Sequence, residues 1–115
     1  MNLKMLFVLA AAIACQCAVA EVKAIKPEYF KVADRVAAEK ALDSRLMADG
    51  YEPIQRMPDA WVRELGHCRV IVSAMFFTNK GELTASIAAS TINCNELEGT
   101  VVAAAMASAR SALAP

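Results

Sequence analysis

The chain has 115 residues, of which 57% are hydrophobic, and its formal net charge at pH 7 is zero. This length is typical of one domain rather than two, and the apolar content is too high for a disordered chain. The balanced charge excludes a strongly basic nucleic-acid-binding protein, so we expect no nucleic-acid partner.

Residues 1–20 have the pattern of a secretory signal peptide. Lys4 is positively charged, the apolar run 5–14 is too short to span a bilayer, and Ala18-Val19-Ala20 matches a small-x-small cleavage site. We therefore expect cleavage after Ala20 and a periplasmic or secreted domain over 21–115, with no membrane span after cleavage.

Two alternatives to a cleaved signal peptide stay open. The apolar run could form a short N-terminal anchor helix, or Cys15 could carry a lipid. The sequence Ala12-Ile13-Ala14-Cys15 loosely resembles a lipobox, but it lacks the leucine expected three positions before the cysteine.

Cleavage would remove Cys15 and Cys17 and leave Cys68 and Cys94. An even number of cysteines in an exported chain is typical of a disulfide. Cys68 opens an expected strand and Cys94 follows the next one, so both lie at the same end of a hairpin, where a bond is geometrically natural. We predict one disulfide. We expect no metal, because His67 and Cys68 would point in different directions on a strand.

The first element predicted in the mature chain is a long helix. Lys26-Pro27-Glu28 is typical of a helix start, the residues up to Ala48 are good helix formers, and Asp49-Gly50 should end the helix. Its expected apolar face, interrupted by Lys40 and Asp43, consists of Tyr29, Val32, Ala33, Val36, Ala37 and Met47.

Pro53 and Pro58 forbid a long regular element in the segment that follows. Residues 59–66 are expected to form one or two helical turns. Trp61 should cover the core as a lid, because tryptophan is rarely left in solvent; a ligand-stacking role is the alternative.

The strongest local pattern predicts a β-hairpin. Residues 68–77 are rich in β-branched and aromatic side chains, Thr78-Asn79-Lys80-Gly81 is a turn, and residues 83–90 alternate between apolar and small polar side chains. A final helix should begin near Asn95 and lie close against the sheet, because it is rich in alanine. The expected fold is α+β: helix, β-hairpin, helix, with a small antiparallel sheet of two or three strands covered by helices on one face and stapled by one disulfide.

The second half of the chain, residues 66–113, resembles the C-terminal domain of the TolA family and the related TonB C-terminal domains. The residues that carry this resemblance are Gly66-His67-Cys68-Arg69-Val70-Ile71-Val72, Asn79-Lys80-Gly81-Glu82-Leu83, Cys94-Asn95-Glu96-Leu97 and the alanine-rich helix. In that family a Gly-x-Cys opens the first strand and is bonded to a second cysteine before the last helix, so the resemblance also implies the Cys68–Cys94 bond.

The chain departs from the family in three ways. We expect no mature transmembrane helix and no long helical spacer, the segment before Gly66 is longer and richer in proline, and the sequence stops at Ala114-Pro115 where the family usually continues into a final strand. A missing final strand would leave a hairpin edge free, and free edges invite strand addition by a partner.

The resemblance implies a non-catalytic interaction module of the cell envelope. We expect it to bind an envelope, phage, bacteriocin or toxin protein by strand addition along 68–77 or 83–90. The partner-binding candidates are Val70, Val72, Ala74, Phe76, Phe77, Leu83, Ala85, Ile87 and Trp61.

Two other functions compete with this one. The alternative is a periplasmic immunity protein that neutralises a toxin or hydrolase. An enzyme would need a polar cluster within 49–67, and the single histidine, His67, has no evident nucleophile partner. We expect no enzymatic activity and no cofactor.

Overall fold

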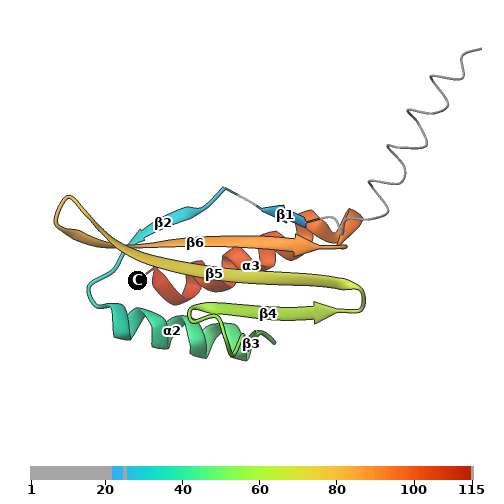
Figure 1. Ribbon diagram of the computed structural model, residues 1–115, viewed down its shortest axis with the longest axis horizontal. Helices are drawn as coiled ribbons and strands as arrows, with labels where there is room; N and C mark the ends of the chain where they lie inside the picture. The colour runs from blue at the N-terminus through green and yellow to red at the C-terminus, as the bar shows by residue number, and fades with distance from the viewer. Residues whose placement is uncertain (1–21, 25, 115) are drawn as a thin grey trace, which may run out of the picture.

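The computed structural model describes residues 22–24 and 26–114, so the expected signal peptide lies outside the described residues (Figure 1). In chain order the elements are β1 Val22–Ala24, β2 Glu28–Lys31, α2 Arg35–Ala48, β3 Glu52–Pro53, β4 Ala60–Leu65, β5 Cys68–Asn79, β6 Glu82–Ile92, a 3₁₀ turn Asn95–Leu97 and α3 Glu98–Leu113. Neither helix among the described residues is long and apolar enough to cross a membrane.

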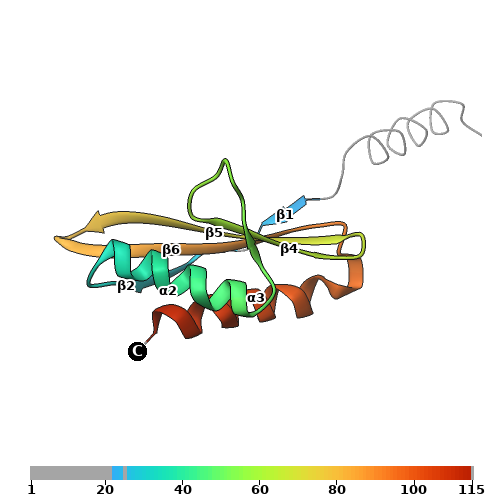
Figure 2. The ribbon, with the colours of Figure 1, turned by 90° about the horizontal axis from the view of Figure 1, so that it is seen from below.

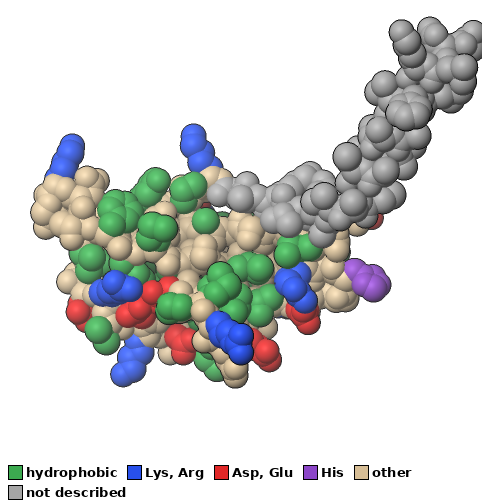
Figure 3. All heavy atoms as spheres, in the orientation of Figure 1, with side chains coloured by type: hydrophobic (Ala, Val, Ile, Leu, Met, Phe, Trp, Pro, Cys, Tyr) green, Lys and Arg blue, Asp and Glu red, His purple; other side chains and the backbone are tan. Residues whose placement is uncertain are grey.

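The strands form one antiparallel sheet in the order β1-β6-β5-β4-β3, and β2 pairs with β6 beside β1. Both helices lie on one face of this sheet, which gives the domain two layers (Figure 2). The opposite face carries no helix among the described residues, and Figure 3 looks onto that bare face. The α+β class and the hairpin are confirmed, but the described residues form a sheet of six strands, which is larger than expected.

The hairpin of β5 and β6 is the longest pairing in the sheet. Its register runs without a bulge from Arg69 opposite Ile92 to Asn79 opposite Glu82. Lys80 and Gly81 both have positive φ, of 54° and 80°, as the two-residue type I′ turn requires. The predicted turn is thus confirmed, and the strands run on to Asn79 and Ile92, beyond the expected ends.

The expected start of the first helix is wrong. The chain from Glu28 to Lys31 forms β2 along β6, and α2 begins at Arg35, after Asp34 accepts a 2.9 Å hydrogen bond from the backbone N–H of Ala37. Asp34 is a strong N-cap, so the helix begins directly after it. Tyr29 and Phe30 gain more from pairing with the otherwise unpaired edge of β6 than from extending the helix. The end of the helix before Gly50, whose φ is 96°, is confirmed.

The predicted apolar face of this helix is wrong as well. Val36 and Met47 are exposed, and the buried residues are Ala38, Leu42 and Leu46, which recur every four residues. This spacing places all three on the side of α2 that faces the core.

The segment that was expected to be helical forms β4. Trp61 pairs with Val72 of β5 and is only 3% exposed, so its expected burial is confirmed although its element is not. Its indole Nε1–H donates to Asp43 Oδ1 at 3.0 Å, which satisfies the polar end of the ring. Pairing with β3 on one side and β5 on the other, together with this hydrogen bond, holds Trp61 in the sheet.

The core lies between the sheet and the two helices. Alternation along β5 and β6 sends Val70, Val72 and Ile87 to the helix side, where each is fully buried. Ala105 and Ala109 of α3 are also fully buried, and their small side chains let this helix lie close to the sheet, as expected.

One polar contact joins the two helices. Ser108 Oγ of α3 donates to Asp49 Oδ2 at 2.6 Å, and Arg45 Nε donates to the same oxygen at 3.1 Å. The hydrogen bond from Ser108 lowers the pKa of Asp49 below its ordinary value. Burial acts in the opposite direction, and the positive charge of Arg45 lowers this pKa further. The carboxylate therefore ties the end of α2 to α3.

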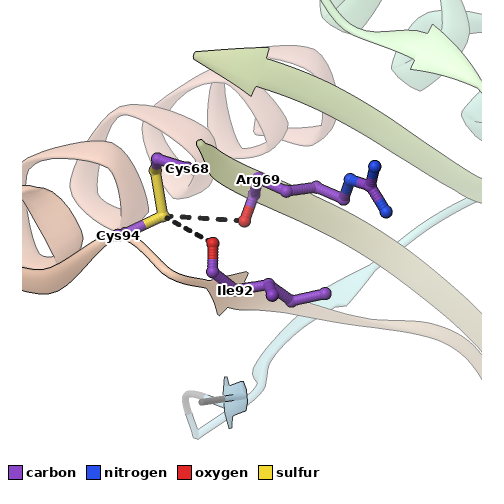
Figure 4. The surroundings of a disulfide bond; sticks show 4 residues. All are labelled: Cys68, Arg69, Ile92 and Cys94. Carbon is purple, nitrogen blue, oxygen red and sulfur yellow. Dashed lines mark hydrogen bonds between the residues drawn. A yellow bond between two sulfur atoms is a disulfide. The ribbon is translucent and has the colours of Figure 1, made fainter. Parts of the chain in front are cut away.

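The predicted disulfide is confirmed. Cys68 and Cys94 are bonded, with their Cα atoms 4.3 Å apart and 26 positions apart in the chain (Figure 4). The Cys94 sulfur also lies 3.6 Å from the carbonyl oxygens of Arg69 and Ile92. A disulfide sulfur has no hydrogen to donate, so these are packing contacts that seat the bond against the ends of β5 and β6.

Replacing both cysteines, as Cys68→Ser with Cys94→Ser, should lower stability by about 3–4 kcal/mol, because the bond removes closure entropy from the unfolded chain. For a domain of this size the melting temperature should fall by roughly 10–30 °C. Thermal unfolding followed by circular dichroism measures this, with reduced wild-type protein as the matched control. A double variant that melts with the oxidised wild type would contradict the prediction.

Ser108→Ala should lower the melting temperature at neutral pH and have little effect in acid. The lowered pKa of Asp49 means that its contribution is present above the ordinary aspartate value of 3.8 and is lost as the pH falls through the folded-state value. Melting curves across acid and neutral pH measure the difference between the two proteins. A deficit that stays constant with pH would show that Ser108 acts only by packing.

Candidate functional site: the open end of β5

Most of the predicted partner-binding side chains belong to the core. Trp61, Val70, Val72, Ala85 and Ile87 are buried under the helices, and Ala74, Phe76 and Leu83 are half-buried. Only Phe77, at 36% exposed, presents a substantial surface.

The expected free edges of the hairpin are largely occupied, which corrects the expected binding surface. From Cys68 to Ser73, β5 lies between β4 and β6. On its other side, β6 is covered by β2 and β1. Proline at Val72 or Ile87 would therefore break the sheet interior rather than block an edge. Two of the strands that occupy these edges, β2 and β4, come from segments whose sequences predict helix.

One stretch of the β5 edge has no described strand partner, because β5 is longer than β4. Pairing of these strands stops at Ser73 opposite Ala60, and the Ala74 N–H then donates to the Asp59 carbonyl at 2.8 Å. Beyond that bond, no described strand pairs with this side of residues 75–79, which we call the open end of β5. Backbone groups alternate in direction along a strand, so the N–H and C=O groups of Phe76 and Thr78 point outward like those of Ala74.

Exposed apolar side chains lie beside the open end of β5 on the bare face. Met75 is 67% exposed and Tyr29, from β2, is 63% exposed. The rings of Tyr29 and Phe77 meet edge to face with centroids 6.2 Å apart. Figure 3 shows apolar side chains gathered on this face of the sheet, near the hairpin turn. The unpaired backbone is therefore accompanied by apolar surface.

On the helix side, charged groups gather at the inner limit of the open end. Arg35 lies over the Phe76 ring, 5.1 Å from its centroid, and its guanidinium is 3.5 Å from Asp59 and 3.6 Å from Glu39. Asp59 has a positive φ of 60°, and its side chain is only 12% exposed. We call Arg35, Glu39 and Asp59 the acidic corner.

The acidic corner contains two carboxyl groups and one guanidinium. A hydrogen bond with Asp59, then burial and the Asp59 charge, raise the pKa of Glu39, while Arg35 opposes this shift. Glu39 and Asp59 thus compete for one positive partner.

A groove adjoins the acidic corner between α2 and the segment that leads into β4. It has a volume of about 370 Å³. Its walls are formed by Val36, Glu39, Lys40, Asp43, Pro53, Ile54, Met57, Pro58, Asp59, Ala60 and Trp61. The described residues hold no group of three or more His, Cys, Asp or Glu side chains placed to bind a metal ion. His67 lies exposed in the turn between β4 and β5.

Comparisons of the chain with protein-family models, with curated proteins and with solved structures found no match.

The sequence alone does not predict the acidic corner or the role of Tyr29. Glu39 belongs to a helix whose mixed charges are typical of a solvated surface, and Asp59 lies twenty positions further on. The signal for Tyr29 is the aromatic pair Tyr29-Phe30, which is typical of a strand but follows a proline that favours a helix start.

Glu39→Gln should remove one loss of stability that wild type undergoes as the pH rises. The raised pKa means that the folded state holds this proton more tightly, so the contribution is present below the ordinary glutamate value of 4.5 and is lost as the pH rises through the folded-state value. The amide keeps a donor for Asp59 without the second charge. Relative to wild type, the melting temperature of Glu39→Gln should rise from acid to neutral pH. Glu96→Gln changes an exposed residue of the 3₁₀ turn and is the matched control, whose difference from wild type should not follow this trend. Equal slopes for all three proteins would contradict the prediction.

Proposed function

We propose that the chain is an exported, non-catalytic protein–protein interaction module that resembles the TolA C-terminal domain and binds a partner by strand addition at the open end of β5. The observation that carries this proposal is the unpaired backbone of Phe76 and Thr78, which lies beside the exposed side chains of Met75 and Phe77. An extended segment placed there would continue the sheet and cover apolar surface at the same time.

The resemblance to the TolA domain is supported by the order of its marker residues. Gly66 precedes β5, Cys68 opens it, Gly81 completes the turn and Cys94 leads into α3. Export is supported by the signal-peptide pattern and by the disulfide, which persists mainly in oxidising compartments. An envelope, phage, bacteriocin or toxin protein is the class of partner that meets a domain in that compartment.

The size of the site limits the affinity. Four backbone groups on Phe76 and Thr78 would contribute about 0.5–1.5 kcal/mol each. Covering the exposed parts of Met75 and Phe77 adds at most about 1.5–3 kcal/mol each. Association itself costs about 4–15 kcal/mol, so the strand alone gives weak binding. A tight partner would also have to cover the bare face around Tyr29.

Thr78→Pro tests strand addition without disturbing the hairpin. The Thr78 N–H points away from β6, so proline removes a donor from the open edge and leaves the ladder to β6 intact. Binding of a strand-adding partner should fall about tenfold or more, because a hydrogen bond is lost and the ring obstructs the edge. The control is Thr78→Val, which keeps the N–H, and all three proteins should melt alike.

The measurement is quantitative mass spectrometry of envelope proteins captured by the oxidised domain. A protein retained by wild type and Thr78→Val but lost by Thr78→Pro is the expected result. A stoichiometric toxin or hydrolase retained equally by all three proteins would favour the immunity function and contradict strand addition at this edge.

A further inference from the structure

The direction of β4 fixes how a strand on the open end of β5 would lie. β4 runs antiparallel to β5 and begins at Ala60. The residue before it, Asp59, accepts the backbone hydrogen bond from Ala74. A strand paired with residues 75–79 would therefore lie end to end with β4, in the same line. If it also runs antiparallel to β5, as every described pair in this sheet does, its C-terminal end faces Asp59.

The two ends of this position carry opposite charge. Next to Asp59 the acidic corner has two carboxyl groups for the single Arg35. At the other end, Lys80 lies exposed in the turn, while Lys31 and Glu82 pair with each other at 3.2 Å. A bound strand thus meets negative charge at one end and positive charge at the other.

The groove supplies a place for a long side chain at the negative end. The groove holds three carboxylates, Glu39, Asp43 and Asp59, against one lysine, Lys40, so its walls keep an excess of negative charge. Val36 also lines it and is 68% exposed, so it offers apolar surface beside the carboxylates. Lysine and arginine place their aliphatic stems on apolar surface and their charged heads among polar groups. Their shape and charge therefore match a groove with both kinds of wall.

We propose that the strand bound at the open end of β5 runs antiparallel to it and carries a lysine or arginine at its C-terminal end, with the side chain in the groove and its charge on Glu39 and Asp59. This inference rests on the proposed function, because it names the class of partner segment that strand addition would select. The largely buried carboxylate of Asp59 makes the attraction stronger than at an exposed pair.

The test uses the oxidised domain and four synthetic peptides, acetylated and amidated so that their ends are neutral. Their sequences are TVTVTK, TVTVTE, TVTVTQ and KTVTVT. Backbone amide shifts in NMR titrations report where each peptide binds, and the shifts of Phe76 and Thr78 mark the open end. We expect TVTVTK to bind there about fivefold more tightly than TVTVTQ, with TVTVTE weakest and KTVTVT no better than TVTVTQ.

Variants assign the preference to the acidic corner. Asp59→Asn should abolish the preference for TVTVTK, and asparagine tolerates the left-handed backbone at this position. Glu39→Gln should reduce the preference without abolishing it. Glu96→Gln is the matched control and should leave the preference unchanged. Added salt should weaken the preference, because screening reduces charge attraction.

The possible outcomes separate the two proposals. Equal binding of all four peptides at Phe76 and Thr78 would uphold strand addition and overturn the basic C-terminal residue. Preference for KTVTVT would overturn the antiparallel direction. Absence of any shift at Phe76 and Thr78 with every peptide would overturn strand addition at this edge, and this inference with it.

Discussion

The uninterrupted ladder between β5 and β6 is the constraint on which the rest of the domain depends. Its register is set at one end by the type I′ turn at Lys80 and Gly81, and the other end is closed by the bond between Cys68 and Cys94. A shift of one residue would move every inward side chain to the bare face, so the turn and the disulfide together decide which residues form the core. The helices, β2 and β4 all pack on surfaces that this ladder presents.

The same ladder creates the candidate site through a difference in strand length. β5 has twelve residues and β4 has six, so half of β5 extends past its neighbour. Natural sheets usually keep an exposed edge short, because a long unpaired edge promotes aggregation. Along β5 the unpaired edge covers only residues 75–79 and ends at a polar turn, which limits what can pair with it. The edge is thus long enough for a short strand and too short to hold a partner without further contacts.

Features that depend on neighbouring residues could be predicted from the sequence. The hairpin turn, the alanine-rich helix and the helix end before Gly50 all follow from local patterns, and the disulfide follows from the cysteine count and the hairpin. β2 and β4 could not be predicted in this way. They are short, and their stability comes from pairing with strands distant in sequence rather than from their own propensity.

The position of the edge could not be predicted for the same reason. Whether a hairpin strand has a free edge depends on which other segments pair with it, and Phe76 differs from Val72 only because β4 begins at Ala60. Burial of Trp61 could be expected from its size alone, whereas its partner Asp43 depends on how α2 crosses the sheet.

Arg35 connects the fold with the site. As the first residue of α2 it lies over Phe76, and its guanidinium contacts both Asp59 and Glu39. One cation can hold the start of a helix, the loop before β4 and the base of the open end together, but it cannot neutralise two carboxylates. The contact that completes the fold at this point therefore leaves an excess of negative charge beside the unpaired edge of β5. An incoming basic segment would supply both the missing hydrogen bonds and the missing charge.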